Sequence, residues 1–182
     1  MRVIAGEAKG RPLKVPKTGT VRPTTERVRE ALFSILEAMD IEWGRVLDLF
    51  AGSGALGIEA LSRGGEWADF VEENRRCCAT IQENLEKTGL ANRAHVYNLK
   101  VHQAINLLSP AYNLVLLDPP FRFPHLSDTL ASLAASGLVA RGGVVVTERF
   151  HRWALEPQYM GLSLYKERSY GDSCLSIYRE EN

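Results

Sequence analysis

The sequence contains three cysteines among 182 residues, and their positions argue against two kinds of site. Cys77 and Cys78 are adjacent, Cys174 is remote, and no C-x-x-C pair occurs. An odd count without paired spacing is typical of reduced thiols in a cytosol, and it argues against a disulfide framework or a zinc site. The four histidines also lack the spacing of metal ligands (His95, His102, His125 and His151). We therefore expect a cytoplasmic protein that needs no metal.

Long hydrophobic runs are absent as well. No apolar run approaches the roughly 20 residues that a membrane-spanning helix needs. The first residues, MRVIAG, lack the apolar core of a secretory signal peptide. Hydrophobic residues make up 45% of the chain and charged residues 24%, which is typical of a globular chain. We expect one domain over residues 1–182, with no membrane partner.

The chain has no net charge, because 22 basic residues balance 22 acidic ones, but the charges are unevenly distributed. Residues 1–29 carry eight basic side chains against two acidic ones, a surplus of six. A basic arm on an otherwise acidic domain favours an anionic polymer as partner. The alternative is a solvated terminal segment without a partner. We expect Arg2, Arg11 and Arg22 of this arm to contact the substrate.

The arm is expected to contain a hairpin and a helix. Residues 2–5 and 12–15 are short extended segments on either side of a glycine-containing turn. Apolar residues then repeat at helical spacing over 25–39. Thr24 and its polar neighbours lead into this helix, and they either cap it or reach a ligand. We expect residues 1–39 to pack on the domain as an extension.

From residue 45 onward, short apolar runs alternate with helical patterns. Strands are expected at 46–50, 68–72, 94–98, 114–117 and 143–148, with helices between successive strands. Repeated βαβ units imply a parallel sheet with helices on both faces. The last part of the chain differs, because 162–168 and 173–178 form two strands without a helix between them. This hairpin is expected to add an antiparallel strand to the sheet.

A glycine loop follows the first strand of this series. Gly52, Gly54 and Gly57 have the spacing of a dinucleotide-binding loop, and Glu72 lies 20 residues after Gly52, where an acid holds ribose hydroxyls. Asp48 lies four residues before the loop and would disfavour a pyrophosphate, but it would attract a sulfonium and an ammonium. S-adenosylmethionine carries both cations, so it is the cofactor we expect. The alternative for Asp48 is a buried structural carboxylate.

A second motif, Asp118-Pro119-Pro120-Phe121, ends the apolar run 114–117. Prolines have no N–H, so this turn offers acceptors, namely the Asp118 carboxylate and the Pro119 carbonyl. A flat group with two N–H donors fits such a site, with Phe121 against its face. An exocyclic amine of a nucleobase is such a group. The alternative is an ordinary turn at the end of a strand.

Together these motifs resemble a known family. The stretch at 46–54, VLDLFAGSG, resembles the first motif of Rossmann-like methyltransferases, and DPPF resembles the motif of those that methylate amino nitrogens. The opening RVIAG, the stretch RPTTERVRE at 22–30 and the late YGD at 170–172 are similar to the RsmD family. That family methylates guanine N2 in small-subunit (16S) ribosomal RNA. The similarity covers nearly the whole chain.

The resemblance implies an α/β fold, the class I methyltransferase sheet of seven mostly parallel strands whose last strand is antiparallel. It implies that Asp48, Gly52 and Gly54 surround the methionine part of S-adenosylmethionine and that Glu72 holds the ribose. It also implies a target-base site with catalytic Asp118, Pro119 and Phe121. Pro120, Thr24 and Tyr170 are expected to contact the substrate. Lys100 stands where related enzymes often place an adenine-binding Asp or Asn, so the backbone near Val101 is expected to read the adenine instead.

Several alternatives stay open. The turn at 118–121 suits adenine N6 or cytosine N4, in RNA or DNA, as well as guanine N2. A protein glutamine is disfavoured, because the enzymes that methylate it usually carry Asn at the position of Asp118 and a larger N-terminal domain. An NAD-dependent oxidoreductase is disfavoured by Asp48, and a non-catalytic RNA-binding protein is disfavoured by the intact turn. Because the arm is small, we expect the substrate to be ribosomal RNA within an assembled small subunit. We also expect the enzyme to be a monomer.

Overall fold

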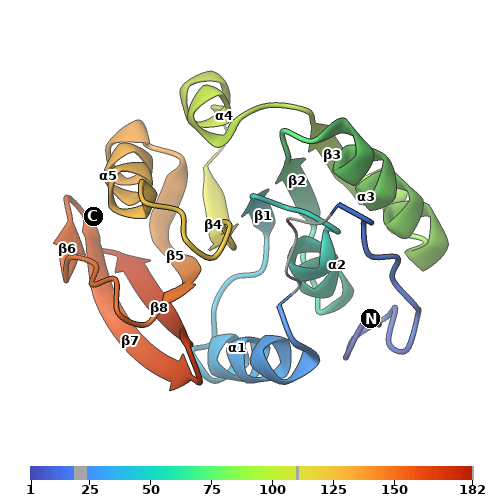
Figure 1. Ribbon diagram of the computed structural model, residues 1–182, viewed down its shortest axis with the longest axis horizontal. Coiled ribbons are helices and arrows are strands. Elements are labelled where there is room, and N and C mark those ends of the chain that lie inside the picture. Colours follow the sequence, from blue (N-terminus) through green and yellow to red (C-terminus); the bar gives the residue numbers. More distant parts are fainter. Residues whose placement is uncertain (19–23, 110, 182) are drawn as a thin grey trace.

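The computed structural model describes residues 1–18, 24–109 and 111–181, and these form an α/β fold around one sheet (Figure 1). The strand order is β3-β2-β1-β4-β5-β8-β7-β6. The first five positions hold the parallel strands, which are β1 (Arg45–Leu49), β2 (Trp67–Val71), β3 (Ala94–Tyr97), β4 (Tyr112–Leu117) and β5 (Val139–Phe150). The predicted parallel sheet is therefore confirmed.

The other end of the sheet is antiparallel. Strand β8 (Ser173–Glu180) lies between β5 and β7 (Leu162–Tyr170) and runs opposite to both. The predicted strand count of seven was wrong, because the described residues contain an eighth strand, β6 (Gln158–Tyr159), paired with the start of β7. Two residues are too few to give an alternating pattern, so no sequence signal marked β6. The expected arrangement, a mostly parallel sheet whose last strand is antiparallel, is unaffected.

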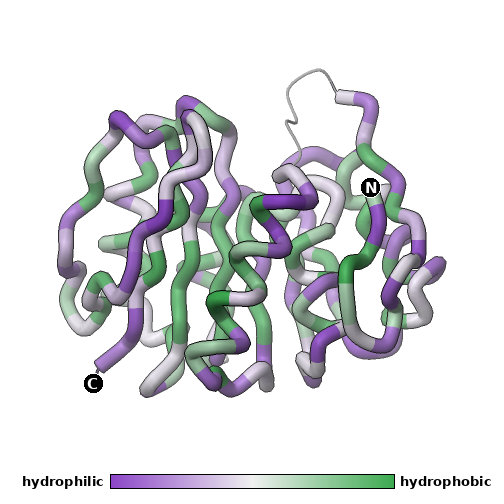
Figure 2. Tube along the Cα trace, turned by 90° about the horizontal axis from the view of Figure 1, so that it is seen from below, coloured by the Kyte–Doolittle hydropathy of each residue, from purple (hydrophilic) through white to green (hydrophobic). Residues whose placement is uncertain are grey.

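Helices cover both faces of the sheet. One apolar cluster joins the sheet to α1 (Glu26–Ala38), α2 (Ala55–Ser62) and α3 (Arg75–Thr88), and a second joins it to α4 (Val101–Leu107) and α5 (Leu126–Ser136). A 3₁₀ turn, η1 (Ala91–Arg93), connects α3 to β3. Hydrophobic segments run through the middle of the molecule (Figure 2). No helix in the described parts of the chain combines the length and apolarity needed to cross a membrane.

The helix boundaries follow local capping chemistry. The Thr25 side chain accepts a hydrogen bond from the Val28 N–H and so begins α1. Asn74 caps α3 by accepting from the N–H groups of Arg76 and Cys77. Gly89 ends α3 in the left-handed conformation, which glycine adopts without steric cost.

The predicted N-terminal hairpin forms in its first part, where an antiparallel bridge joins Arg2 to Pro12 and the Val3 N–H donates to the Arg11 carbonyl at 3.0 Å. The backbone N–H groups of Ile4 and Ala5 donate instead to the Glu59 carboxylate of α2, at 2.9 and 3.0 Å. Residues 4 and 5 are thus bonded to the body of the protein rather than to the opposite segment. Their binding to α2 brings the arm against the same face as α1.

The sheet places four acidic residues at one edge. Leu49 of β1 aligns with Leu117 of β4, and Leu117 aligns with Thr147 of β5. Because the carboxyl ends of parallel strands share one edge, the acids there lie near one another. Glu72 directly follows β2, Asp118 directly follows β4, and Asp48 and Glu148 lie within the last residues of β1 and β5.

Candidate functional site

A cavity of about 1170 Å³ opens at this edge of the sheet. Its lining includes all four acids, the turn at 118–121, and Gly52 and Ser53 of the glycine loop, while the predicted Gly54 lies outside the lining as the N-cap residue of α2. Small-molecule sites usually occupy roughly 300–1,000 Å³. The cavity therefore has room for a cofactor and part of a second substrate side by side.

Asp48 anchors the glycine loop. Its side chain is 1% exposed, and its Oδ2 accepts a hydrogen bond from the Gly57 N–H at 2.9 Å. A Cβ on residue 57 would lie 2.4 Å from the Phe70 ring, so only glycine allows this approach of α2 to the sheet. Burial raises the pKa of Asp48, and the carboxylates of Asp118 and Glu72 raise it further. A cationic ligand in the cavity would relieve this cost, so the site fits a sulfonium or an ammonium.

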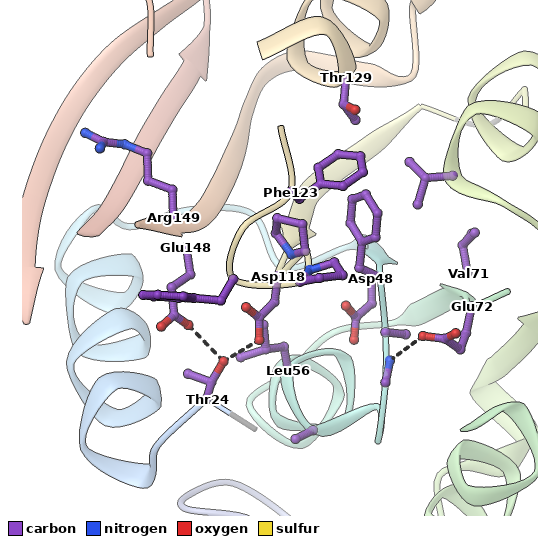
Figure 3. A pocket seen from close by; sticks show the side chains of 18 of the residues that line it. Thr24, Asp48, Leu56, Val71, Glu72, Asp118, Phe123, Thr129, Glu148 and Arg149 are labelled. Carbon is purple, nitrogen blue, oxygen red and sulfur yellow. Dashed lines mark hydrogen bonds between the residues drawn. The ribbon is translucent and has the colours of Figure 1, made fainter. Parts of the chain in front are cut away.

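Glu72 is held at the end of β2 by the backbone around it. Its Oε1 accepts from the Gly52 N–H at 3.1 Å (Figure 3), and its Oε2 accepts from the Asn74 N–H at 2.7 Å. The Asn98 side chain donates to the carbonyl oxygens of Glu72 and of its neighbour Glu73. The carboxylate stays partly exposed and keeps acceptor capacity toward the cavity, as a ribose ligand needs. Sequence reasoning missed Asn98, although an asparagine directly after a strand was a usable signal.

The start of α4 forms another wall of the cavity. Lys100 is the N-cap residue, and its backbone N–H donates to the Gln103 side chain at 3.0 Å. Val101 follows as the first helical residue, and both residues line the cavity. The first N–H groups of a helix have no partner within it, so they are available to a ligand. This geometry suits the predicted role of the Val101 backbone.

Asp118 belongs to a cluster of three polar side chains from three parts of the chain. The Thr24 hydroxyl lies within hydrogen-bond reach of both Asp118 Oδ2 and, at 2.9 Å, Glu148 Oε2 (Figure 3). Burial and the Glu148 carboxylate raise the pKa of Asp118 to about 7, while the bond to Thr24 opposes the rise. Thr24 was predicted as a ligand or a cap, and its hydroxyl faces the carboxylates while Thr25 caps α1. Glu148 was missed by sequence reasoning.

Aromatic rings border the turn at 118–121. Pro119 is buried, and the Pro120 carbonyl accepts from the Phe123 N–H at 2.9 Å, which closes the turn. Phe121 packs edge-on against Phe150, with ring centroids 5.0 Å apart. Phe50, which lines the cavity beside the glycine loop, has φ of 58°. Such a conformation is strained for a bulky residue and is typical of functional sites.

The predicted substrate residues fall into three groups. Tyr170, like Thr24, lines the cavity. Arg2 and Arg11 lie outside its lining, where Arg2 pairs with Glu26 at 3.1 Å and Arg11 donates to the Lys87 carbonyl at 3.4 Å. Arg22 lies outside the described residues. A substrate contact of Arg2 or Arg11 would therefore be made on the outer surface.

The chain matches a family model over residues 1–179, described as conserved hypothetical protein 95. It is 35% identical over 181 residues to ribosomal RNA small subunit methyltransferase D of Escherichia coli K12, covering 100% of this chain and 90% of that one. A solved hypothetical protein of Thermus thermophilus is 33% identical, with a TM-score of 0.82 over 97% of this chain and 98% of that one.

A more distant solved structure shares the fold. It is an RNA methyltransferase from Salinibacter ruber in complex with S-adenosyl-L-homocysteine, at 17% identity and a TM-score of 0.66, covering 88% of this chain and 95% of that one. At this identity the likeness concerns the arrangement of helices and strands alone.

Proposed function

This chain belongs to the conserved hypothetical protein 95 family, the RsmD family, and on that premise we propose that it methylates the exocyclic N2 of a guanine in 16S ribosomal RNA. It is an S-adenosylmethionine-dependent rRNA methyltransferase. One observation carries the choice of an amine as acceptor. The Asp118 turn faces the same cavity as the glycine loop, so an amine at the turn lies beside the methyl donor's site.

The residues of the cavity fit S-adenosylmethionine, which supplies a methyl group on a positively charged sulfur. We assign Asp48 and the loop at Gly52 and Gly54 to the methionine part. Glu72 takes the ribose, and the backbone at Val101 takes the adenine. The buried carboxylate of Asp48 supports this assignment, because its negative charge has no cation partner among the described side chains.

The target amine is held by acceptors. The lone pair of guanine N2 is delocalised into the ring, so the amine is a poor nucleophile. The Asp118 carboxylate and the Pro119 carbonyl accept hydrogen bonds from the two N–H groups of this amine. These two bonds orient the amine so that its lone pair points at the methyl carbon. Positive charge grows on the nitrogen during transfer, and fixed acceptors stabilise that charge. Phe121 stacks on the base, which is unpaired or flipped out, and such stacking contributes about 1–3 kcal/mol.

The substrate in this proposal is an assembled small ribosomal subunit in the cytoplasm, methylated by a monomeric enzyme. The arm is short, and two of its cations are already paired, Arg2 with Glu26 at the start of α1 and Lys14 with Glu83 on α3. Such an arm supports binding to a particle that already presents the base.

The deciding experiment offers naked 16S RNA, assembled subunits and DNA as methyl acceptors, and identifies the product by nucleoside mass spectrometry. A product other than N2-methylguanosine would overturn the proposal and favour the adenine or cytosine alternative.

The transfer rate is expected to rise with pH through about 7, because the Asp118 carboxyl must be ionised to accept hydrogen bonds. Its pKa is raised by burial and by Glu148, and Asp48 also faces it. Below that pKa, kcat/KM should fall about tenfold per pH unit. A kcat/KM profile measured with saturating cofactor checks this. In Glu148→Gln the inflection should move to lower pH, and a profile that is flat between about pH 5 and 8 would contradict the ionisation of Asp118.

Neutralising the arm is expected to weaken substrate binding without changing the chemical step. The triple variant of Arg2, Arg11 and Lys14 to glutamine should lose up to three phosphate contacts, and it should flatten the slope of log K against log salt by about 0.7–0.9 per contact. Filter binding to assembled subunits over a salt series measures this. If affinity and slope match the parent protein, the arm is only a solvated terminus.

A further inference from the structure

Glu148 is the acid at this edge of the sheet to which the proposed reaction gives no role. It lies one residue after Thr147, which aligns with Leu117, so Glu148 and Asp118 occupy neighbouring positions on β5 and after β4. Both side chains are partly exposed and both line the cavity. Figure 3 shows them on either side of the Thr24 hydroxyl.

The two carboxylates have more acceptor capacity than the protein fills. Among the described residues, the Thr24 hydroxyl is the hydrogen-bond donor that reaches them, and one hydroxyl has one hydrogen to donate. Neither carboxylate forms an ion pair with a described lysine, arginine or histidine. Two adjacent acceptors without enough donors, at the wall of a cavity, fit a ligand that brings several N–H groups along one edge.

Guanine has such an edge, and the other amine-bearing bases do not. Next to the N2 amine, guanine carries an N1–H, so its edge presents adjacent donors. Next to the N6 amine of adenine stands N1 with a lone pair, and next to the N4 amine of cytosine stands N3 with a lone pair. A carboxylate at that neighbouring position bonds guanine and repels adenine and cytosine. A site with a polar group meant for a donor rejects a base that lacks the donor, because the polar group is left unpaired.

We propose that Glu148 selects guanine by accepting the N1–H of the target base, while Asp118 and the Pro119 carbonyl accept the two hydrogens of N2. This inference rests on the proposed methylation of N2 and adds the reason for its base specificity. Thr24 is a positioning residue that holds the two carboxylates side by side. The turn at 118–121 recognises an amine, and Glu148 recognises what stands next to the amine.

The test is a cycle of two enzymes and two bases. The parent protein and Glu148→Gln are each given the same RNA with either guanine or 2-aminopurine at the target position. 2-Aminopurine keeps the amine but has a lone pair at N1 and no oxygen at carbon 6. Loss of that oxygen affects both enzymes alike, so the cycle isolates the contact between residue 148 and N1.

We expect Glu148→Gln to lower kcat/KM about 10-fold on guanine, because the neutral amide keeps an acceptor but loses the charge that strengthens the hydrogen bond. On 2-aminopurine Glu148→Gln should be at least as active as the parent, because the carboxylate that faces the N1 lone pair has been replaced by a neutral amide. A Glu30→Gln variant, on the exposed face of α1 outside the cavity lining, serves as the matched control and should behave like the parent.

Equal losses on both bases would overturn the role in base selection and leave Glu148 as a support for Thr24. The cofactor affinity of Glu148→Gln, measured by calorimetry, should equal that of the parent, which separates a specificity defect from a damaged fold. If the parent protein transfers no methyl group to guanine N2 at all, the proposed function fails, and that result is distinct from either outcome of the cycle.

Discussion

Replacing Asp118 with alanine is expected to abolish methyl transfer while cofactor binding is retained. Asp118 is the charged acceptor at the turn, and removing one fixed stabilising group of this kind costs about 10²–10³-fold in kcat. The cofactor contacts are assigned to Asp48 on β1, to Glu72 directly after β2 and to the glycine loop before α2, and the substitution leaves them intact. Single-turnover transfer from labelled S-adenosylmethionine and calorimetric titration of the cofactor measure the two effects separately.

Two further variants make this test specific. Asp118→Asn keeps one carbonyl acceptor, so it should retain more activity than alanine but less than the parent. Glu86→Ala, on the exposed face of α3, should leave both transfer and cofactor affinity unchanged. Near-normal turnover of Asp118→Ala would remove the residue from the mechanism, and a loss of cofactor affinity would show that it acts at the other half of the cavity.

Much of this site could be predicted because its signals are local. Asp48 interrupts the apolar run 46–50 just before the glycine loop, Asp118 ends the apolar run 114–117, and Glu72 ends the predicted strand that follows the glycine loop. Parallel strands bring such positions to one edge of the sheet. Once the strands were predicted from their periodicity, these residues could therefore be predicted to lie near one another. The helices between successive strands were predicted for the same reason, since periodicity depends on near neighbours.

The missed features depend on contacts between distant segments. Glu148 precedes an arginine at the end of a strand, which in sequence is typical of a solvated strand end. Only the fold brings its carboxylate to the Thr24 hydroxyl, which lies 124 residues away in the chain. For the arm, the sequence overstated the amount of unpaired positive charge. Arg2 and Lys14 add to a basic segment when counted along the sequence, yet Arg2 is paired with Glu26 of α1 and Lys14 with Glu83 of α3.

Glu59 has the largest expected effect on stability, and it too was not foreseen. It is fully buried in α2, accepts from the Ile4 and Ala5 N–H groups and from Arg63 Nε at 2.9 Å, and lies 3.7 Å from Arg29 Nη1. Burial lowers the pKa of Arg29, and Glu59 opposes that shift. In Glu59→Ala the buried guanidinium would lose its partner, which costs about 3–5 kcal/mol. The free energy of unfolding of a domain is about 5–15 kcal/mol in total, so this loss of stability is severe.

Urea unfolding followed by circular dichroism measures this free energy, and Glu37→Ala is the matched control. Glu37 also pairs with Arg63, at 2.8 Å, but its side chain is 54% exposed, so its loss should cost about 0–1 kcal/mol. Equal stabilities of the two variants would contradict the role of Glu59. Amide exchange should also become faster at Ile4 and Ala5 in Glu59→Ala, because their N–H groups lose their acceptor. Arg29 lies on α1, and Thr24 directly precedes Thr25, the N-cap residue of that helix. The same variant should therefore also make the Thr24 hydroxyl between Asp118 and Glu148 more mobile. Where Glu59→Ala stays folded, its transfer rate should therefore fall, although residue 59 lies outside the cavity lining.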